Sequence, residues 1–198
     1  MIELKIFRRT LVRKFSRIFL TGVFLVAAGA AYSGEPAVQR FALPSHGALE
    51  LSFPSSWHSQ LRQPPGSLPP TITLTPTAGA PFQVLITPVW AMSPRDPLPN
   101  DAAIHDEVAA AAKSAAPESV EGTLLLQDLR GPRNRGYYFF ATDRAPKPGE
   151  FKYMTQGIVQ LGGINLAFTV LTNDGQDAIV KAALDVLRIA VQKSDGAV

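Results

Sequence analysis

Alternating apolar and polar residues predict several strands from residue 48 onward. In Ala48–Phe53, the apolar residues Leu49, Leu51 and Phe53 alternate with polar ones and are expected to face a core. The runs 71–75 and 82–87 lie on either side of a short turn-rich segment, which predicts a hairpin. Further strands are expected at about 122–129, 136–143, 151–161 and 164–172, the last two joined by a tight turn at Gly162-Gly163.

Two other segments carry apolar residues at helical spacing. One begins at Asn100-Asp101 and runs to about Ala116, with an apolar face made of Ile104, Val108, Ala111, Ala112 and Ala115. The other follows the last strand, where Asp174 is expected to cap the helix and Asp177 lies in its first turn. Its apolar stripe consists of Ile179, Ala182, Ala183, Val186, Leu187 and Ala190, and the tail from Lys193 onward is expected to fray.

The order of these elements predicts an α+β fold. Two proline-rich segments, 62–70 and 93–99, are expected to be extended loops, because proline cannot donate a backbone hydrogen bond to a sheet. About three strands, a helix, four strands and a second helix remain, with short links that favour antiparallel pairing. We therefore expect one domain, an antiparallel sheet of about six or seven strands flanked by two helices.

The first 33 residues have the pattern of a cleavable secretory signal. Six basic residues and one acidic residue precede or border the apolar run 19–31, which is too short and too rich in glycine and alanine to be a comfortable membrane span. Ala31 and Ser33 supply small residues for cleavage after Ser33; cleavage after Ala30 and an uncleaved anchor are the alternatives. Arg8-Arg9 leaves both the general secretory and the twin-arginine route open.

Removal of this leader changes the charge of the protein. The whole chain has a net charge of +3, but residues 34–198 contain 13 basic and 15 acidic residues, a net charge of −2. Such a domain has no general electrostatic attraction to nucleic acid or anionic lipid. The chain contains no cysteine, which excludes a lipoprotein anchor, disulfides and cysteine-based catalysis or metal binding. We expect a periplasmic or secreted protein with no stable membrane anchor after cleavage.

The first strand closes on Phe53-Pro54-Ser55-Ser56-Trp57. Together with the order of elements, this resembles the PsbP/Mog-type proteins, which have an α/β/α sandwich around an antiparallel sheet. The resemblance covers roughly residues 38–192. The family includes accessory subunits of photosystem II, a Ran-binding protein and exported bacterial proteins, so the resemblance implies a non-catalytic binding or accessory module. It brings no shared set of functional residues.

Candidate catalytic and metal-binding groups are few. Asp101 and His105 lie one helical turn apart and could hold a metal with help from elsewhere, or form a solvated pair on the helix surface. Ser56 lies close to His58, but no Gly-x-Ser-x-Gly elbow is present to support a serine nucleophile. We therefore expect no catalytic residue, no metal and no cofactor; a hydrolase remains the least favoured hypothesis.

One basic cluster stands out in the mature chain. Arg130, Arg133 and Arg135 lie in one hairpin loop, and Tyr137 follows closely. Arginine and tyrosine in this arrangement could bind an acidic partner, a lipid headgroup or another anion, or they could form a solvated turn. Trp57 and Trp90 each follow a strand and could line a pocket or close the edge of the core.

Two functional hypotheses follow from these observations. The first is an exported non-catalytic accessory or protein-binding module of the cell envelope, whose partner is another envelope protein and not nucleic acid. The second is a carrier of a small apolar ligand held between the sheet and the first helix, where Ala109–Ala112 could leave room beside Trp57 or Trp90.

The leader generates a direct prediction. Protein recovered from its cell is expected to begin at Gly34, because the small residues Ala31 and Ser33 precede that position. Sequencing the N-terminus of the recovered protein measures this. Full-length protein embedded in the inner membrane would contradict the prediction.

Overall fold

The computed structural model describes residues 36–64, 68–91, 93 and 97–193. The predicted secretory leader and its predicted cleavage site lie outside the described residues. Within these ranges the chain forms two antiparallel sheets and two α-helices. None of the helices in these ranges is long and apolar enough to cross a membrane.

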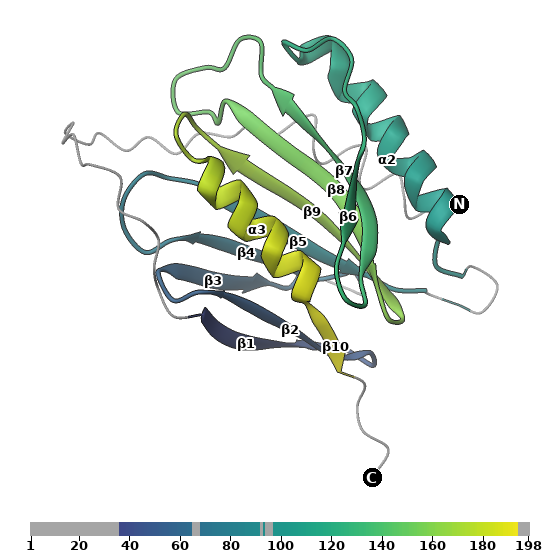
Figure 1. The fold of residues 1–198 in the computed structure, drawn as a ribbon. Coiled ribbons are helices and arrows are strands. Elements are labelled where there is room, and N and C mark those ends of the chain that lie inside the picture. Colours follow the sequence, from purple (N-terminus) through teal and green to yellow (C-terminus); the bar gives the residue numbers. More distant parts are fainter. Residues whose placement is uncertain (1–35, 65–67, 92, 94–96, 194–198) are drawn as a thin grey trace.

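The larger sheet has seven strands and every neighbouring pair is antiparallel. Its order is β3-β4-β5-β9-β8-β7-β6 (Figure 1). The strands are β3 (Trp57–Arg62), β4 (Thr71–Pro76), β5 (Gln83–Val89), β6 (Gln127–Arg130), β7 (Arg135–Thr142), β8 (Tyr153–Leu161) and β9 (Ile164–Thr172). Two long central strands, β8 and β9, therefore separate the β3–β5 half from the β6–β7 edge.

A second sheet of three strands, in the order β1-β2-β10, packs beside the first. It consists of β1 (Pro36–Leu43), β2 (Gly47–Pro54) and β10 (Val191–Lys193). Leu49, Leu51 and Phe53 of β2 are buried in the same core cluster as Phe168 of β9. The small sheet therefore covers part of one face of the large one.

The two helices lie on opposite faces of the large sheet (Figure 1). Adjacent side chains of a strand point to opposite faces. Phe168 of β9 belongs to the cluster that contains the buried residues of α3 (Asp177–Ile189), whereas Ala167 belongs to the cluster of α2 (Asp101–Ala115). A short 3-10 helix, η1 (Ala116–Glu118), continues α2. The arrangement is a layered α+β fold with the large, seven-stranded sheet at its centre.

Most elements expected from the sequence are confirmed. The Asn100 side chain caps α2 by accepting a hydrogen bond from the Ala103 N–H at 3.0 Å, and Ile104, Val108 and Ala112 are buried. The β4–β5 hairpin is present. The β8–β9 turn places Gly162 at a φ of 58°, a left-handed conformation that glycine adopts without strain.

Three strands were not expected from the sequence: β1, β3 and β10. Residues 36–40 of β1 and most of β3 are exposed, so neither strand shows the alternation that marks a half-buried strand. β3 therefore occupies residues expected to lead into a proline-rich loop. Of the tail predicted to fray from Lys193 onward, Lys193 itself is paired with Ala48 of β2, next to Val191 opposite Glu50. The remaining tail residues, 194–198, lie outside the described residues.

Two other expectations are wrong in detail. The strand predicted at 122–129 is only Gln127–Arg130, because Leu124 packs into the α2 cluster and the Glu121 carboxylate binds the backbone N–H of Thr142 on β7 at 3.1 Å. Asp174 does not cap α3: its carboxylate accepts hydrogen bonds from Lys152 and Tyr153. Gln176 occupies the cap position of that helix without a side-chain capping bond.

Buried amide side chains hold both ends of α3. At the N-terminal end, the Gln176 amide donates to the carbonyl oxygens of Ala80 and Pro81, at 3.3 and 3.1 Å. At the C-terminal end, the Nδ2 of Asn134 lies 2.9 Å from the Leu187 carbonyl oxygen and 3.1 and 3.0 Å from those of Arg188 and Ala190. The last carbonyls of a helix lack partners within the helix, so Asn134 satisfies groups that would otherwise be buried unpaired.

The β6–β7 loop also approaches α3 through its backbone. A Cβ atom built on Gly131 would lie 2.0 Å from the carbonyl oxygen of Arg188. Only glycine fits such an approach, since the obstructing atoms belong to the backbone and cannot rotate away. Gly131 and Asn134 together attach the loop to the end of the helix.

Replacing Asn134 with alanine should lower the free energy of unfolding by about 1–3 kcal/mol, because buried carbonyl groups lose their donor. Asn134→Asp should cost more, since it places a negative charge against the negative end of α3. The midpoint of urea unfolding measures both changes. Gln127→Ala, which removes an exposed amide from the same hairpin, is the matched control and should change the midpoint little.

Candidate functional site

The structure brings the four predicted surface residues together at the tip of the β6–β7 hairpin. Arg130, Arg133, Arg135 and Tyr137 line a surface hollow of about 330 Å³, together with Asp101 and Asp128. The hollow lies between the hairpin and the N-terminal end of α2. We call this group of four residues the arginine hairpin.

Two of its arginines face each other across the strand pair. Arg130 and Arg135 are register partners, and like charges directly opposite each other destabilise a sheet. Arg130 is balanced by Asp128, with Nη2 and Nε lying 3.1 and 3.3 Å from Oδ2 of that carboxylate. Within the described part of the chain, neither Arg133 nor Arg135 forms an ion pair. Both are exposed, so their guanidinium groups are available to an anion.

Tyr137 is turned toward α2. Its hydroxyl donates a hydrogen bond to Oδ2 of Asp101 at 3.0 Å, and this bond raises the pKa of the tyrosine above its usual value. The ring packs edge-on against His105, with centroids 5.0 Å apart. Asp101 is thus engaged by Tyr137, and the described residues contain no group of three metal-binding side chains.

The two tryptophans lie apart from this hairpin. Trp57 is 4% exposed and packs against Phe82 in the main core, with ring centroids 4.9 Å apart. Trp90 is partly buried against the same core and meets His46 edge-on at 4.6 Å. Neither tryptophan lines the hollow at the arginine hairpin or the groove described next.

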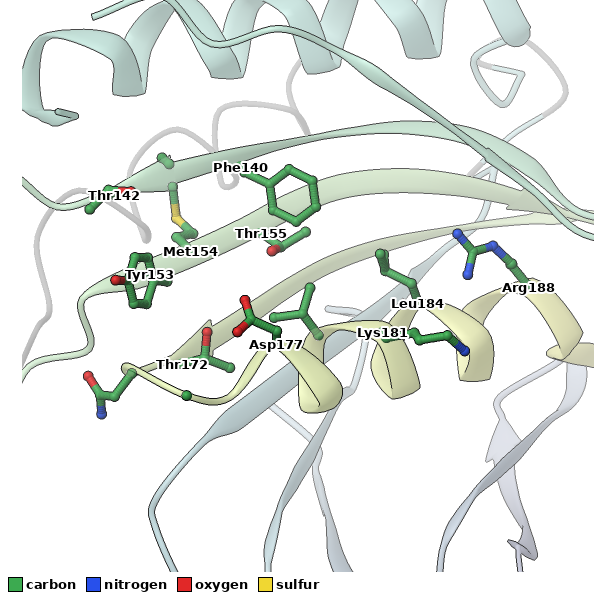
Figure 2. A pocket seen from close by; sticks show the side chains of 14 residues that line it. Phe140, Thr142, Tyr153, Met154, Thr155, Thr172, Asp177, Lys181, Leu184 and Arg188 are labelled. Atoms are coloured by element: carbon green, nitrogen blue, oxygen red, sulfur yellow. The ribbon is translucent and has the colours of Figure 1, made fainter. Parts of the chain in front are cut away.

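A second hollow, of about 380 Å³, lies between α3 and strands β7, β8 and β9 (Figure 2). We call it the α3 groove. Val180 and Leu184 of the helix line one wall, and Phe140 and Thr155 of the strands line the other. No site was predicted from the sequence at this groove. Its signal was present: Val180 and Leu184 are apolar residues one turn apart and outside the stripe assigned to the core.

Charged side chains border the α3 groove. Asp185 accepts hydrogen bonds from Lys181 at 2.8 Å and from Arg188 at 2.6 Å. Partial burial tends to raise the pKa of Asp185, but these two hydrogen bonds outweigh it and the pKa is lowered. Asp185 therefore stays ionised at neutral pH and partly balances the two cations.

The two hollows offer different chemistry. The arginine hairpin presents guanidinium donors at an exposed and largely polar surface, which suits recognition of carboxylates or other anions. The α3 groove is mostly apolar and has charged groups only along its helical wall. One therefore favours a charged partner and the other an apolar group.

This chain resembles solved structures at low sequence identity. No family model matches the chain, and no curated protein matches it in sequence. A crystal structure of a protein from Bacteroides thetaiotaomicron VPI-5482 aligns with a TM-score of 0.50 and 13% identity, covering 79% of this chain; the chain spans 49% of that protein. The solution structure of cyanobacterial PsbP (CyanoP) from Synechocystis sp. PCC 6803 aligns with a TM-score of 0.45 and 12% identity, covering 84% of this chain and 98% of the other. At 13% identity, the match to the Bacteroides protein shows a likeness of fold alone.

The facing arginines generate a stability prediction. Arg135→Gln should raise the free energy of unfolding at low salt by a few tenths of a kcal/mol, and by about 1 kcal/mol at most, because it removes a like-charge pair. The gain should vanish at about 1 M salt, where such charges are screened. Thermal unfolding at both salt concentrations measures it. Arg133→Gln, which removes a loop arginine without a cross-strand partner, should show no comparable gain.

Proposed function

We propose that this chain is an exported, non-catalytic accessory module that binds another protein of the cell envelope through the arginine hairpin. The observation that carries the proposal is the pair of exposed arginines, Arg133 and Arg135, held without ion-pair partners in the described structure on an anchored loop. The leader supports export, and residues 34–198 would form the single exported domain.

The anchoring of the loop favours binding. Asn134 lies between the two arginines and is 4% exposed, with its amide bound to the last carbonyls of α3. A loop whose backbone is already ordered loses little conformational entropy when a partner docks. Arg133 and Arg135 therefore extend into solvent from a rigid base, an arrangement that suits recognition better than a mobile loop would.

The charge distribution favours an acidic partner. The mature chain has a net charge of −2, yet three arginines gather at this one hairpin against the carboxylates of Asp128 and Asp101. Opposite charges across an interface steer association and suppress unsuitable partners. An acidic patch on another envelope protein would also relieve the repulsion between Arg130 and Arg135.

The proposal predicts a specific loss of partner capture. Arg133→Ala combined with Arg135→Ala should reduce crosslinking to the envelope partner at least several-fold, because two guanidinium donors are removed. Crosslinking in living cells, followed by identification of the captured protein, measures the effect. The melting temperature should not fall, since both side chains are exposed.

A matched variant controls for the change in charge. Arg40 and Arg62 are exposed arginines on β1 and β3, far from the hairpin in the sheet order. Arg40→Ala combined with Arg62→Ala alters the net charge equally and should leave capture unchanged. Equal capture by the hairpin variant and the wild type would refute the proposed contact surface.

A further inference from the structure

The α3 groove exists because α3 crosses the large sheet obliquely. Gln176 ties the start of the helix to Pro81, just before β5, whereas Asn134 ties its end to the loop between β6 and β7. In the strand order β5-β9-β8-β7-β6, these attachments lie toward opposite edges. One corner of the sheet, formed by the end of β7 and the start of β8, is therefore left uncovered by the helix (Figure 1).

The groove has a mostly apolar lining and is partly open to solvent. Phe140, on β7, is 41% exposed although the strand continues on both sides of it. Leu184 on the facing helix is 5% exposed, and Thr155 and Thr172 are each 2% exposed while lining the groove. The volume of about 380 Å³ is within the range of small-ligand sites.

The two ends of the helical wall carry opposite charges. Asp177 lines the groove in the first turn of α3 and Arg188 in the last. They are eleven positions apart, which corresponds to about 16 Å along the helix axis. Figure 2 shows the Arg188 guanidinium on the side of the helix that faces the strands, beyond Leu184.

Arg188 has hydrogen-bond donors that Asp185 does not use. Its Nη1 donates to Asp185 at 2.6 Å, and its side chain is 31% exposed. A guanidinium carries five N–H donors in a planar fork, so several remain for a carboxylate at the end of the groove. Asp177 lies at the opposite end of the groove and repels a carboxylate there. The ligand is therefore expected to bind in one orientation, with its carboxylate at Arg188.

From these observations we propose that the α3 groove binds a single unbranched alkyl chain with a carboxylate head, a fatty acid. The carboxylate binds Arg188, and the chain lies along Leu184 and Val180 opposite Phe140. Burial of the alkyl chain supplies the affinity, and the ion pair with Arg188 selects a carboxylate as the head group. This site uses none of the residues of the arginine hairpin, so it is independent of the proposed protein contact.

Binding of dodecanoate to the whole protein tests the proposal. Isothermal titration below the critical micelle concentration should show saturable binding of one dodecanoate per chain. Dodecan-1-ol should bind about tenfold more weakly, because one charge-assisted hydrogen-bonded contact is lost. Dodecylamine should bind more weakly still. An absence of saturable dodecanoate binding, or equal affinity for the three compounds, would overturn the proposal.

Two variants locate the site. Arg188→Gln should weaken dodecanoate about tenfold and leave dodecan-1-ol unchanged, because only the head-group contact is lost. Phe140→Ser should weaken both compounds, since it removes apolar surface from the groove, and it is safe for folding because Phe140 is already 41% exposed. Unchanged dodecanoate affinity in both variants would place any binding elsewhere and refute the site.

The control variant separates this site from the arginine hairpin. Arg133→Gln removes an exposed arginine of that hairpin and should leave dodecanoate affinity unchanged. A loss of affinity in Arg133→Gln equal to that in Arg188→Gln would show general attraction of the anion to basic residues and would overturn the assignment to the groove.

Discussion

The docking of α3 is the interaction on which the rest of the structure depends. Ile179, Ala183, Val186 and Leu187 are buried in the core that joins the large sheet to β2 of the small one. Burying such side chains supplies most of the driving force for packing, but this force is not directional. The side-chain amides of Gln176 and Asn134 fix the orientation of α3 on the sheet, because each binds carbonyl groups at a defined position. After Ile189, the same helix leads directly into β10, which completes the small sheet.

Asn134 connects the two candidate sites. It lies between Arg133 and Arg135 in the β6–β7 loop, and its amide binds the carbonyl oxygen of Arg188, whose side chain borders the α3 groove. The close approach of Gly131 to the same carbonyl reinforces the contact. The exposed arginines and the end of the groove are therefore positioned by one set of buried backbone contacts.

The sequence predicted those parts of the fold that depend on local periodicity. The helix with its Asn100 cap, the long strands and the glycine turn all carry signals within a few neighbouring residues. The strands β1 and β10 depend on pairing with β2, and β3 depends on pairing with β4, so their own residues give little indication. The role of Asn134 joins residues more than 50 positions apart, and the α3 groove joins residues up to 48 positions apart. No local pattern encodes contacts of that kind. The arginine hairpin was predicted because its four residues lie within eight positions of one another, whereas the groove is assembled from residues of β7, β8, β9 and α3.

Two features of the fold depart from what stability alone would favour, although the Phe140 ring packs edge-on against Tyr138 at 5.2 Å. Arg130 and Arg135 face each other across a strand pair, and Phe140 exposes an aromatic ring in the middle of a strand. A threonine at either place would suit an exposed strand better, because it is β-branched and uncharged. Natural proteins depart from such local rules mainly where a function requires it, since substitutions that improve stability alone are readily available. Both departures border a hollow, one polar and one apolar. Stability therefore does not explain the facing arginines, whereas the binding proposed at the hollows would account for both departures.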